Sequence, residues 1–240
     1  MGYKTGVEWT SHTWNPWRGC SKLSEGCQKC YWFRDANRYG YSPTEVVRSK
    51  TTFQDPLKWK EPSFIFACSW SDFFHNEADG WRNEAWEIIR NTPHHTYQIL
   101  TKRPENILTR LPSDWDVGYE NVWLGVSVEN KKHGIPRISI LRSVPAQLRF
   151  LSVEPLLEDV ADELDLTGIH WLIVGGESDY TNPRPMEPEW ALRIIEKCEQ
   201  ENIPVFLKQL GGSKKVNGHW GGNSINGKTW TQKPNMGGDF

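Results

Sequence analysis

The sequence predicts an α/β fold, arranged as a complete or partial (β/α) TIM-like barrel, because short apolar runs alternate with helical stretches along the chain. Six such runs of strand length are visible, and stretches with helical spacing of apolar residues lie between them. This alternation is typical of a parallel sheet whose strands are buried on both faces. Nothing marks a dinucleotide-binding fold, since Gly175-Gly176 is not a GxGxxG motif.

The elements can be placed in chain order. A strand is expected at 14–18, a short helix at 31–40 that Gly40 ends, and an irregular stretch rich in Pro and Lys at 41–63. The six strands are expected at 64–69, 97–101, 122–127, 148–153, 170–175 and 204–208. The helices between them are expected at 79–91, near 104–111, near 130–143, and at 188–202. No linker interrupts the series, so residues 1–240 are expected to form one domain whose glycine-rich tail, 211–240, is an ordered coil or a small hairpin.

Composition narrows the classes of partner. The formal net charge is −2, which disfavours broad binding to phosphates, so any nucleic-acid contact would rest on a local basic patch. No run of roughly 18 apolar residues is present and the N-terminus lacks the apolar stretch of a signal peptide, so we expect no membrane span and a cytoplasmic location. The 14 tryptophans are expected mainly in the core, with some lining a pocket for a flat ligand.

Three of the five cysteines, Cys20, Cys27 and Cys30, fall within eleven residues, and a glycine directly precedes each of the first two. Thiolates are ligands of zinc and of iron–sulfur clusters. An N-terminal iron–sulfur loop is therefore one interpretation. A cluster held by only three protein thiolates leaves one iron open to a further ligand.

A zinc site is a second interpretation, with a fourth ligand from His12, His75 or Cys68, and incidental cysteines that bind no metal are a third. Zinc sites favour paired C-x2-C units, and only Cys27 and Cys30 form one here. The remaining cysteines, Cys68 and Cys198, are expected to be small core residues on a strand and a helix.

Polar side chains follow every predicted strand at its carboxyl end, where a barrel carries its active site. Acids and bases alternate there along the chain. The residues are Ser69, Ser71, Asp72, Thr101, Lys102, Arg103, Ser127, Glu129, Glu154, Glu177 and Lys208. The pattern predicts that the carboxyl-terminal end of the barrel is charged and binds a zwitterionic or polyfunctional ligand.

These motifs resemble two known groups. A three-cysteine loop at the entry to a (β/α) barrel resembles the radical S-adenosylmethionine superfamily, although the spacing here is C-x6-C-x2-C and the superfamily usually has C-x3-C-x2-C. Nearly the full chain resembles a small protein family whose members are found in bacteriophages and prophages. The pieces that carry this resemblance are EWT at 8–10, TWNP at 13–16, GC at 19–20 and 26–27, CY at 30–31, SDFFH at 71–75, LTKRP at 100–104, NVWLGVSVE at 121–129, RFLSVEPL at 149–156, IVGGES at 173–178, RPM at 184–186 and FLKQ at 206–209.

The superfamily resemblance implies two cofactors. Cys20, Cys27 and Cys30 would hold a [4Fe–4S] cluster whose open iron chelates S-adenosylmethionine, and the reduced cluster would cleave it to a 5′-deoxyadenosyl radical. The cofactor's carboxylate would then be bound by Lys102 or Arg103. Its amino group would be bound by Ser69, Ser71 or Asp72, and its ribose by Ser127 or Glu129.

The phage resemblance implies the reaction. Some members of that group are implicated in DNA hypermodification, where an N-linked glycyl group on the 5-methyl carbon of thymine is rearranged to a C-linked one. The substrate would be a modified thymidine, in DNA or as a nucleotide, in the cytoplasm of an infected bacterium. Catalytic contacts would come from Glu154, Glu177 and Lys208, with Glu154 able to face either ligand. The electron donor would be a protein such as flavodoxin or ferredoxin.

Two other functions remain open at this point. A zinc-stabilised nucleic-acid-binding module without catalysis would account for the cysteines and tryptophans, but predicts a basic surface. A hydrolase that uses Glu154 and Glu177 as paired carboxylates would leave the cysteine loop unexplained.

Overall fold

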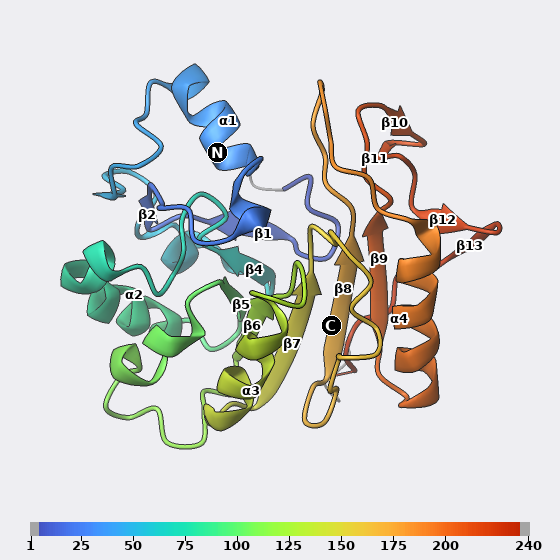
Figure 1. Cartoon of the computed structure of the whole chain (residues 1–240). Helices are drawn as coiled ribbons and strands as arrows, with labels where there is room; N and C mark the ends of the chain where they lie inside the picture. The colour runs from blue at the N-terminus through green and yellow to red at the C-terminus, as the bar shows by residue number, and fades with distance from the viewer. Residues whose placement is uncertain (1–4, 236–240) are drawn as a thin grey trace. The chain divides into compact units, whose positions relative to one another are not determined.

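The computed structural model describes residues 5–235, which form a mixed α/β chain with one seven-stranded parallel sheet (Figure 1). In spatial order the strands are β1 (His12–Trp14), β4 (Phe64–Ala67), β5 (Thr96–Thr101), β6 (Val122–Ser127), β7 (Leu148–Val153), β8 (Trp171–Gly175) and β9 (Val205–Gln209). The predicted α/β class is confirmed. The order is open, with β1 and β9 as its end strands, so the topology corresponds to a partial β/α barrel and not to a complete one.

Four α-helices and six short 3-10 helices accompany the sheet. The α-helices are α1 (Tyr31–Asp35), α2 (Asp79–Asn91), α3 (Ile135–Ser143) and α4 (Pro188–Gln200). The 3-10 helices are η1 (Glu25–Cys27), η2 (Ala36–Tyr39), η3 (Asp55–Lys58), η4 (Asn76–Ala78), η5 (Pro104–Asn106) and η6 (Leu108–Arg110). These counts refer to residues 5–235. The helices predicted at 79–91 and 188–202 are confirmed, and Gly40 ends the 31–39 helical stretch in the left-handed conformation, as expected.

Prolines and a glycine account for the expected elements that the structure places differently. The strand expected at 14–18 is instead β1 at 12–14, and Pro16 separates it from β2 (Trp17–Arg18), which pairs antiparallel with β3 (Val47–Arg48). The helix expected near 104–111 is only η5 and η6, since Pro112 disfavours the helical conformation at the preceding residue. The helix expected near 130–143 begins at Ile135, because Gly134 closes a tight turn against Asn130.

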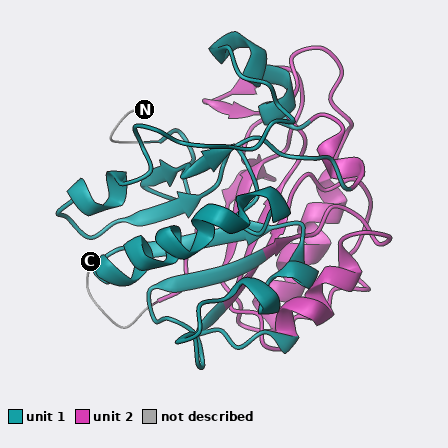
Figure 2. Ribbon diagram, turned by 90° about the vertical axis from the view of Figure 1, so that its left-hand side faces the viewer, with its two compact units in different colours: residues 1–23, 30–125, 143–148 teal, residues 24–29, 126–142, 149–240 magenta. Residues whose placement is uncertain are grey.

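The chain forms two compact units, each assembled from discontinuous segments (Figure 2). The first comprises residues 1–23, 30–125 and 143–148, and the second comprises 24–29, 126–142 and 149–240. The expectation of a single domain stays a prediction.

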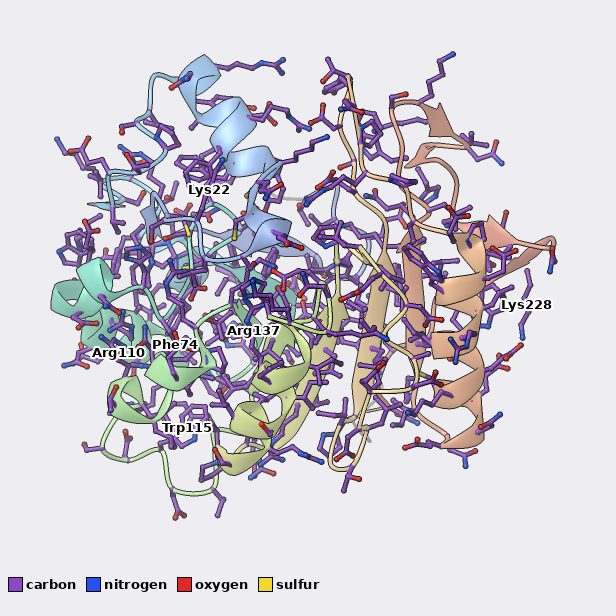
Figure 3. All side chains as sticks on the ribbon, in the orientation of Figure 1. Lys22, Phe74, Arg110, Trp115, Arg137 and Lys228 are labelled. Atoms are coloured by element: carbon purple, nitrogen blue, oxygen red, sulfur yellow. The ribbon has the colours of Figure 1, made fainter. Side chains whose placement is uncertain are left out.

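Tryptophans build the core of the first unit. The Trp17 and Phe73 rings lie 5.2 Å apart, Phe73 and Trp86 lie 4.9 Å apart, and Trp86 contacts Trp115 at 5.3 Å between centroids (Figure 3 labels Trp115). All four side chains are buried. Aromatic packing around α2 therefore forms part of the hydrophobic core of this unit, as expected for the majority of the tryptophans.

The second unit packs α4 on β8 and β9 and ends in two small hairpins. In the first hairpin β10 (Lys215–Val216) pairs with β11 (His219–Trp220), and in the second β12 (Ser224–Ile225) pairs with β13 (Lys228–Thr229). Each turn is an Asn-Gly pair with positive φ at both residues, which is the type I′ turn that matches the twist of a hairpin. The tail expected as ordered coil or one small hairpin thus contains two hairpins; its last residues, 236–240, lie outside the described part of the chain.

None of the helices within residues 5–235 has the length and apolar character needed to cross a membrane.

Gly176→Ala is predicted to destabilise the protein. A Cβ atom at this position would lie 2.1 Å from the carbonyl oxygen of Leu210, so the chain after β9 would have to move, at a cost of about 1–3 kcal/mol. Gly80→Ala, in the first turn of α2, has nothing within 4 Å of the new atom and should leave stability unchanged or slightly higher. Urea unfolding followed by circular dichroism measures both, and equal stability of the two variants would contradict the prediction.

Candidate functional site

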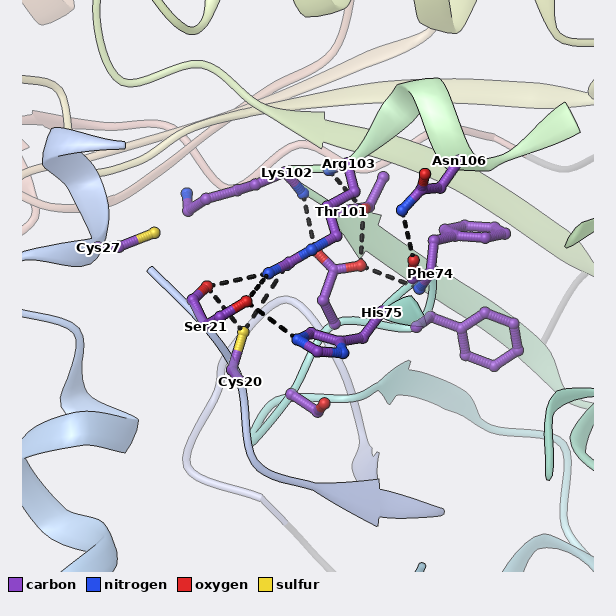
Figure 4. Close-up of polar contacts among 12 residues, drawn as sticks. Cys20, Ser21, Cys27, Phe74, His75, Thr101, Lys102, Arg103 and Asn106 are labelled. Carbon is purple, nitrogen blue, oxygen red and sulfur yellow. Dashed lines mark hydrogen bonds and ion pairs between the residues drawn. The ribbon is translucent and has the colours of Figure 1, made fainter. Parts of the chain in front are cut away.

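The buried carboxylate of Asp72 organises the strand ends of the first unit (Figure 4). Its Oδ1 accepts hydrogen bonds from the Phe74 N–H at 2.9 Å and the Thr101 hydroxyl at 2.7 Å. Its Oδ2 accepts from the Lys102 N–H at 3.0 Å and from Arg103 Nη1 at 3.1 Å. Four donors, one of them a guanidinium, satisfy the charge of a carboxylate that burial alone would strongly disfavour.

Arg103 connects this network to the cysteine loop. Its Nη2 donates to the backbone oxygen of Ser21 at 2.9 Å and to the Ser21 hydroxyl at 2.8 Å. Its Nη1 also donates to Cys20 Sγ at 3.8 Å. Arg103 is 5% exposed, so a permanent positive charge is held beside the first cysteine.

His75, in its neutral form, also contacts Ser21, the residue that Arg103 binds. Its Nδ1 accepts from the Glu77 N–H at 3.3 Å, so the proton of the neutral ring is on Nε2, which lies 3.1 Å from the Ser21 hydroxyl. Burial, and after it the charge of Arg103, lowers the pKa of His75 below its ordinary value. Ser21 Oγ thus accepts two hydrogen bonds, from His75 and Arg103, and its own proton is available for donation.

The thiol of Cys20 is in a polar and charged environment, unlike the core cysteine Cys198 on α4. Burial, and then the negative charge of Asp72, raises the pKa of Cys20 to about 12, although Arg103 acts in the opposite direction. Cys30 is near enough to contribute to the same shift, and it directly precedes α1. Without a metal the Cys20 thiol is protonated at neutral pH, and binding of a metal would release that proton.

The serines at the end of β4 also bind the loop. Ser69 Oγ and the Asn15 side chain exchange hydrogen bonds at 3.0 and 3.3 Å, and Asn15 Oδ1 accepts from the Trp70 N–H at 2.7 Å. Ser71 Oγ donates to the Gly19 carbonyl at 2.6 Å. Gly19 has φ +100°, and a Cβ there would lie 2.0 Å from the Glu45 carbonyl oxygen, so only glycine can occupy this position directly before Cys20.

Within the second unit, the segment that carries Cys27 is fixed by Glu129. This fully buried carboxylate pairs with Arg137 from α3 and accepts a hydrogen bond from the Ser24 hydroxyl. A Cβ on Gly26 would lie 2.5 Å from Glu129 Cγ, which explains the glycine before Cys27. Cys27 itself is buried, 3.8 Å from the Ser24 hydroxyl.

The three residues expected to act on substrate belong to two ion pairs of the second unit. Lys208 Nζ lies 3.1 Å from Glu154 Oε1, and Ser152 donates to the other oxygen of Glu154 at 3.1 Å. Gly175 makes room for Glu154, since a Cβ there would lie 2.4 Å from Oε1. Glu177 is bound by Arg184, whose N–H and Nε donate to Oε2 at 2.9 and 3.0 Å.

The expected site residues therefore form two sets. In the first unit, Ser69, Ser71, Asp72 and Arg103 all bind the loop that carries Cys20, while Lys102 is half-buried at the same strand end and its side chain extends away from Arg103 (Figure 4). In the second unit, Glu129 binds the Cys27 segment and Ser127 is buried at the end of β6. No expected site residue lies outside the described chain.

The cysteines are all free thiols. Cys20 and Cys30 belong to the first unit and Cys27 to the second. Among residues 5–235, no three His, Cys, Asp or Glu side chains are grouped as a ready set of metal ligands. The donor set is nevertheless chemically suited to a soft metal centre, since it consists of thiols only, one of them beside a buried cation.

Several residues that build the site were not singled out from the sequence. Ser21 and Ser24 lie within the C-x6-C spacing, but that spacing does not distinguish them from their neighbours, and Arg137 lies in no motif. Asn15 and Arg184 lie within the WNP and RPM pieces, and those pieces could have identified both.

A family model described as "Protein of unknown function (DUF5131)" matches residues 4–234. The chain belongs to this family. The match covers both units, with all three loop cysteines and every strand end discussed above. No curated protein sequence and no solved structure matches the chain significantly.

Arg103→Gln is predicted to be strongly destabilising, because it leaves the Asp72 carboxylate buried without its cation. Loss of one partner of a buried pair costs about 3–5 kcal/mol. Arg110→Gln is the matched control, since Arg110 pairs with Asp79, whose side chain is 54% exposed, and should cost under about 1 kcal/mol. Urea unfolding measures the difference.

The double variant Asp72→Asn with Arg103→Gln separates charge from packing. It contains no unpaired buried charge and should recover part of the stability lost in Arg103→Gln. Equal losses for Arg103→Gln and Arg110→Gln would show that the buried pair is not a major constraint.

Stability is predicted to fall as the pH drops below about 6.5. Burial lowers the pKa of His75, His95 and His170 in the folded protein from the ordinary value of 6.5. Below that value the unfolded chain takes up protons that the folded histidines do not, so protonation favours unfolding. Free energies of unfolding between about pH 7.5 and 5 should show this slope, and His75→Gln should reduce it. A flat profile over this range would contradict the assignment.

Proposed function

We propose that the protein is a radical S-adenosylmethionine enzyme in which Cys20, Cys27 and Cys30 hold a [4Fe–4S] cluster. The observation that carries the proposal is the contact of the buried Arg103 guanidinium with Cys20 Sγ, in a loop that contains three of the five free cysteines. A hydrogen-bond donor with a permanent charge favours thiolate over thiol. Its place at the carboxyl end of a parallel strand, where barrels carry their active sites, agrees with a catalytic role.

The network around Asp72 suggests how the loop is prepared for the cluster. Arg103 and Ser71 fix the backbone at Ser21 and Gly19, and Ser69 binds the Asn15 side chain, so the loop at Cys20 has a defined position before any metal binds. In the second unit, Glu129 and Ser24 do the same for Cys27. When bound, the cluster supplies the electron that cleaves S-adenosylmethionine to methionine and a 5′-deoxyadenosyl radical.

The same contacts narrow the residues that would bind S-adenosylmethionine. Arg103 and Asp72 bind each other, so we assign the cofactor's carboxylate to Lys102. Ser127 and Glu129 remain candidates for the ribose. Glu129 can contribute only if its bonds to Arg137 and Ser24 rearrange.

Substrate would be bound at the pairs Glu154–Lys208 and Glu177–Arg184. A glycyl group carries an amine and a carboxylate, and each pair presents one partner for either charge. We propose a modified thymidine as substrate, rearranged from an N-linked to a C-linked glycyl group during phage DNA hypermodification in the cytoplasm of an infected bacterium. A flavodoxin or ferredoxin would deliver the electron. The choice of this reaction is supported by the resemblance to the phage family alone.

Anaerobic reconstitution with iron and sulfide tests the proposal. The wild-type chain should develop the absorption of thiolate-to-iron charge transfer and an EPR signal after reduction. Cys20→Ala, Cys27→Ala and Cys30→Ala should each lose most of both signals. Cys198→Ala, a buried cysteine of α4, is the matched control and should retain them.

Product formation distinguishes the zinc alternative. With reductant and S-adenosylmethionine, the reconstituted wild type should release 5′-deoxyadenosine, and the three cysteine variants should not. A Cys27→Ala protein with a complete cluster would refute the ligand assignment. Tightly bound zinc, with no 5′-deoxyadenosine formed, would favour the zinc-stabilised binding module.

A further inference from the structure

Positive charge is concentrated near the end of the chain. Between Glu201 and Asp239 the sequence contains Lys208, Lys214, Lys215, Lys228 and Lys233 but no aspartate or glutamate, although the whole chain carries a net charge of −2. Lys214 and Lys215 are exposed on the β10–β11 hairpin. A local basic surface is therefore present on a chain that is weakly acidic overall.

Aromatic rings accompany these lysines. Tyr180, in the loop after β8, is 59% exposed, and its ring meets the Trp220 ring of β11 edge to face at 4.8 Å between centroids. Lys215 Nζ lies 5.6 Å from the Trp220 centroid on the same hairpin. Lys29 donates to the Asn182 carbonyl in the Tyr180 loop. Aromatic rings interleaved with cations are the combination that binds the bases and phosphates of single-stranded nucleic acid.

The loop after β8 contains three acidic residues, Glu177, Asp179 and Glu187, of which Glu177 pairs with Arg184 of the same loop. The Asp179 carboxylate accepts hydrogen bonds from the N–H and the hydroxyl of Thr181, at 3.0 and 3.1 Å, and so closes a local turn. Because Arg184 compensates Glu177, the three lysines Lys29, Lys214 and Lys215 outnumber the two remaining acidic residues, Asp179 and Glu187.

The hairpin is firmly attached to the end of β9. Gly211 N–H donates to the Trp220 carbonyl at 2.9 Å, Leu210 N–H to the Gly222 carbonyl at 2.7 Å, and Gly212 N–H to the Glu177 carbonyl at 2.8 Å. Figure 1 shows β10 and β11 beyond the end of β9, beside the loop that follows β8. The basic aromatic surface thus adjoins the strand ends that carry Lys208 and Glu177.

We infer that the surface of Tyr180, Trp220, Lys214 and Lys215 binds single-stranded DNA and delivers a base to the adjoining pairs Glu154–Lys208 and Glu177–Arg184. The choice of DNA rests on the proposed function, whereas the stacking and charge do not. The inference makes the substrate a base within a polynucleotide and not a free nucleotide.

Fluorescence anisotropy with a labelled short oligothymidylate and the full-length chain tests the inference, and it needs neither cluster nor cofactor. The double variant Lys214→Gln with Lys215→Gln should weaken binding about tenfold. The salt slope, which is the decrease of log K with log salt concentration, should become shallower by about 0.7 for each lost phosphate contact. Lys228→Gln is the matched control, since Lys228 lies on the other hairpin and pairs with Glu199 (Figure 3). It should bind as the wild type does.

Tyr180→Ala tests stacking separately. It should weaken binding about tenfold while leaving the salt slope unchanged, because it removes a ring and no charge. Tyr39→Ala, which removes another exposed tyrosine, in the first unit, is its control and should have no effect. Equal thermal stability of all variants excludes misfolding as the cause.

The outcomes distinguish this inference from the proposed function. Undiminished binding by both the lysine and the Tyr180 variants overturns the inference, as does tighter binding of duplex DNA or of oligouridylate than of oligothymidylate. Cluster formation without DNA binding overturns the inference and leaves the proposed function standing. DNA binding by a chain that forms no cluster supports the inference and refutes the proposed enzyme.

Discussion

The buried ion pair of Asp72 and Arg103 is the interaction on which the candidate site of the first unit depends. Neither charge could be buried alone, because the loss of hydration would exceed the gain from packing. Together they join the ends of β4 and β5 and bind the backbone of Ser21. The position of the loop at Cys20 is therefore a consequence of satisfying two buried charges.

This ion pair also shows that the polar residues at the strand ends have a structural role. Ser69, Ser71 and Arg103 were natural candidates to face a ligand, yet each hydrogen-bonds to the N-terminal loop. A polar group at the end of a barrel strand can build the wall of a site as well as contact what enters it. In the proposed enzyme, recognition of the cofactor consequently depends on fewer residues, with Lys102 foremost.

The second unit follows the same principle with different charges. Glu129 is buried against Arg137 and fixes the segment around Cys27. Glu154 pairs with Lys208 of β9, and Glu177 pairs with Arg184 in the loop after β8. Such ion pairs can exchange partners with a charged ligand, since each new contact replaces an old one. Beside them, the lysines of the β10–β11 hairpin have no acidic partners in their own segment of sequence.

The sequence by itself determined the parallel α/β class, six of the seven sheet strands and the two long helices, because apolar periodicity reflects burial directly. It also marked most of the strand-end residues from which the candidate site is built, since polar groups after buried strands stand out. Only the tertiary structure decided their roles. Whether Arg103 binds a ligand or Asp72 depends on which groups approach it in space, and Ser21, Ser24 and Arg137 have no local pattern that reveals their partners. Hydrophobic periodicity is a property of neighbours along the chain, whereas charge compensation in a buried site is a property of neighbours in space.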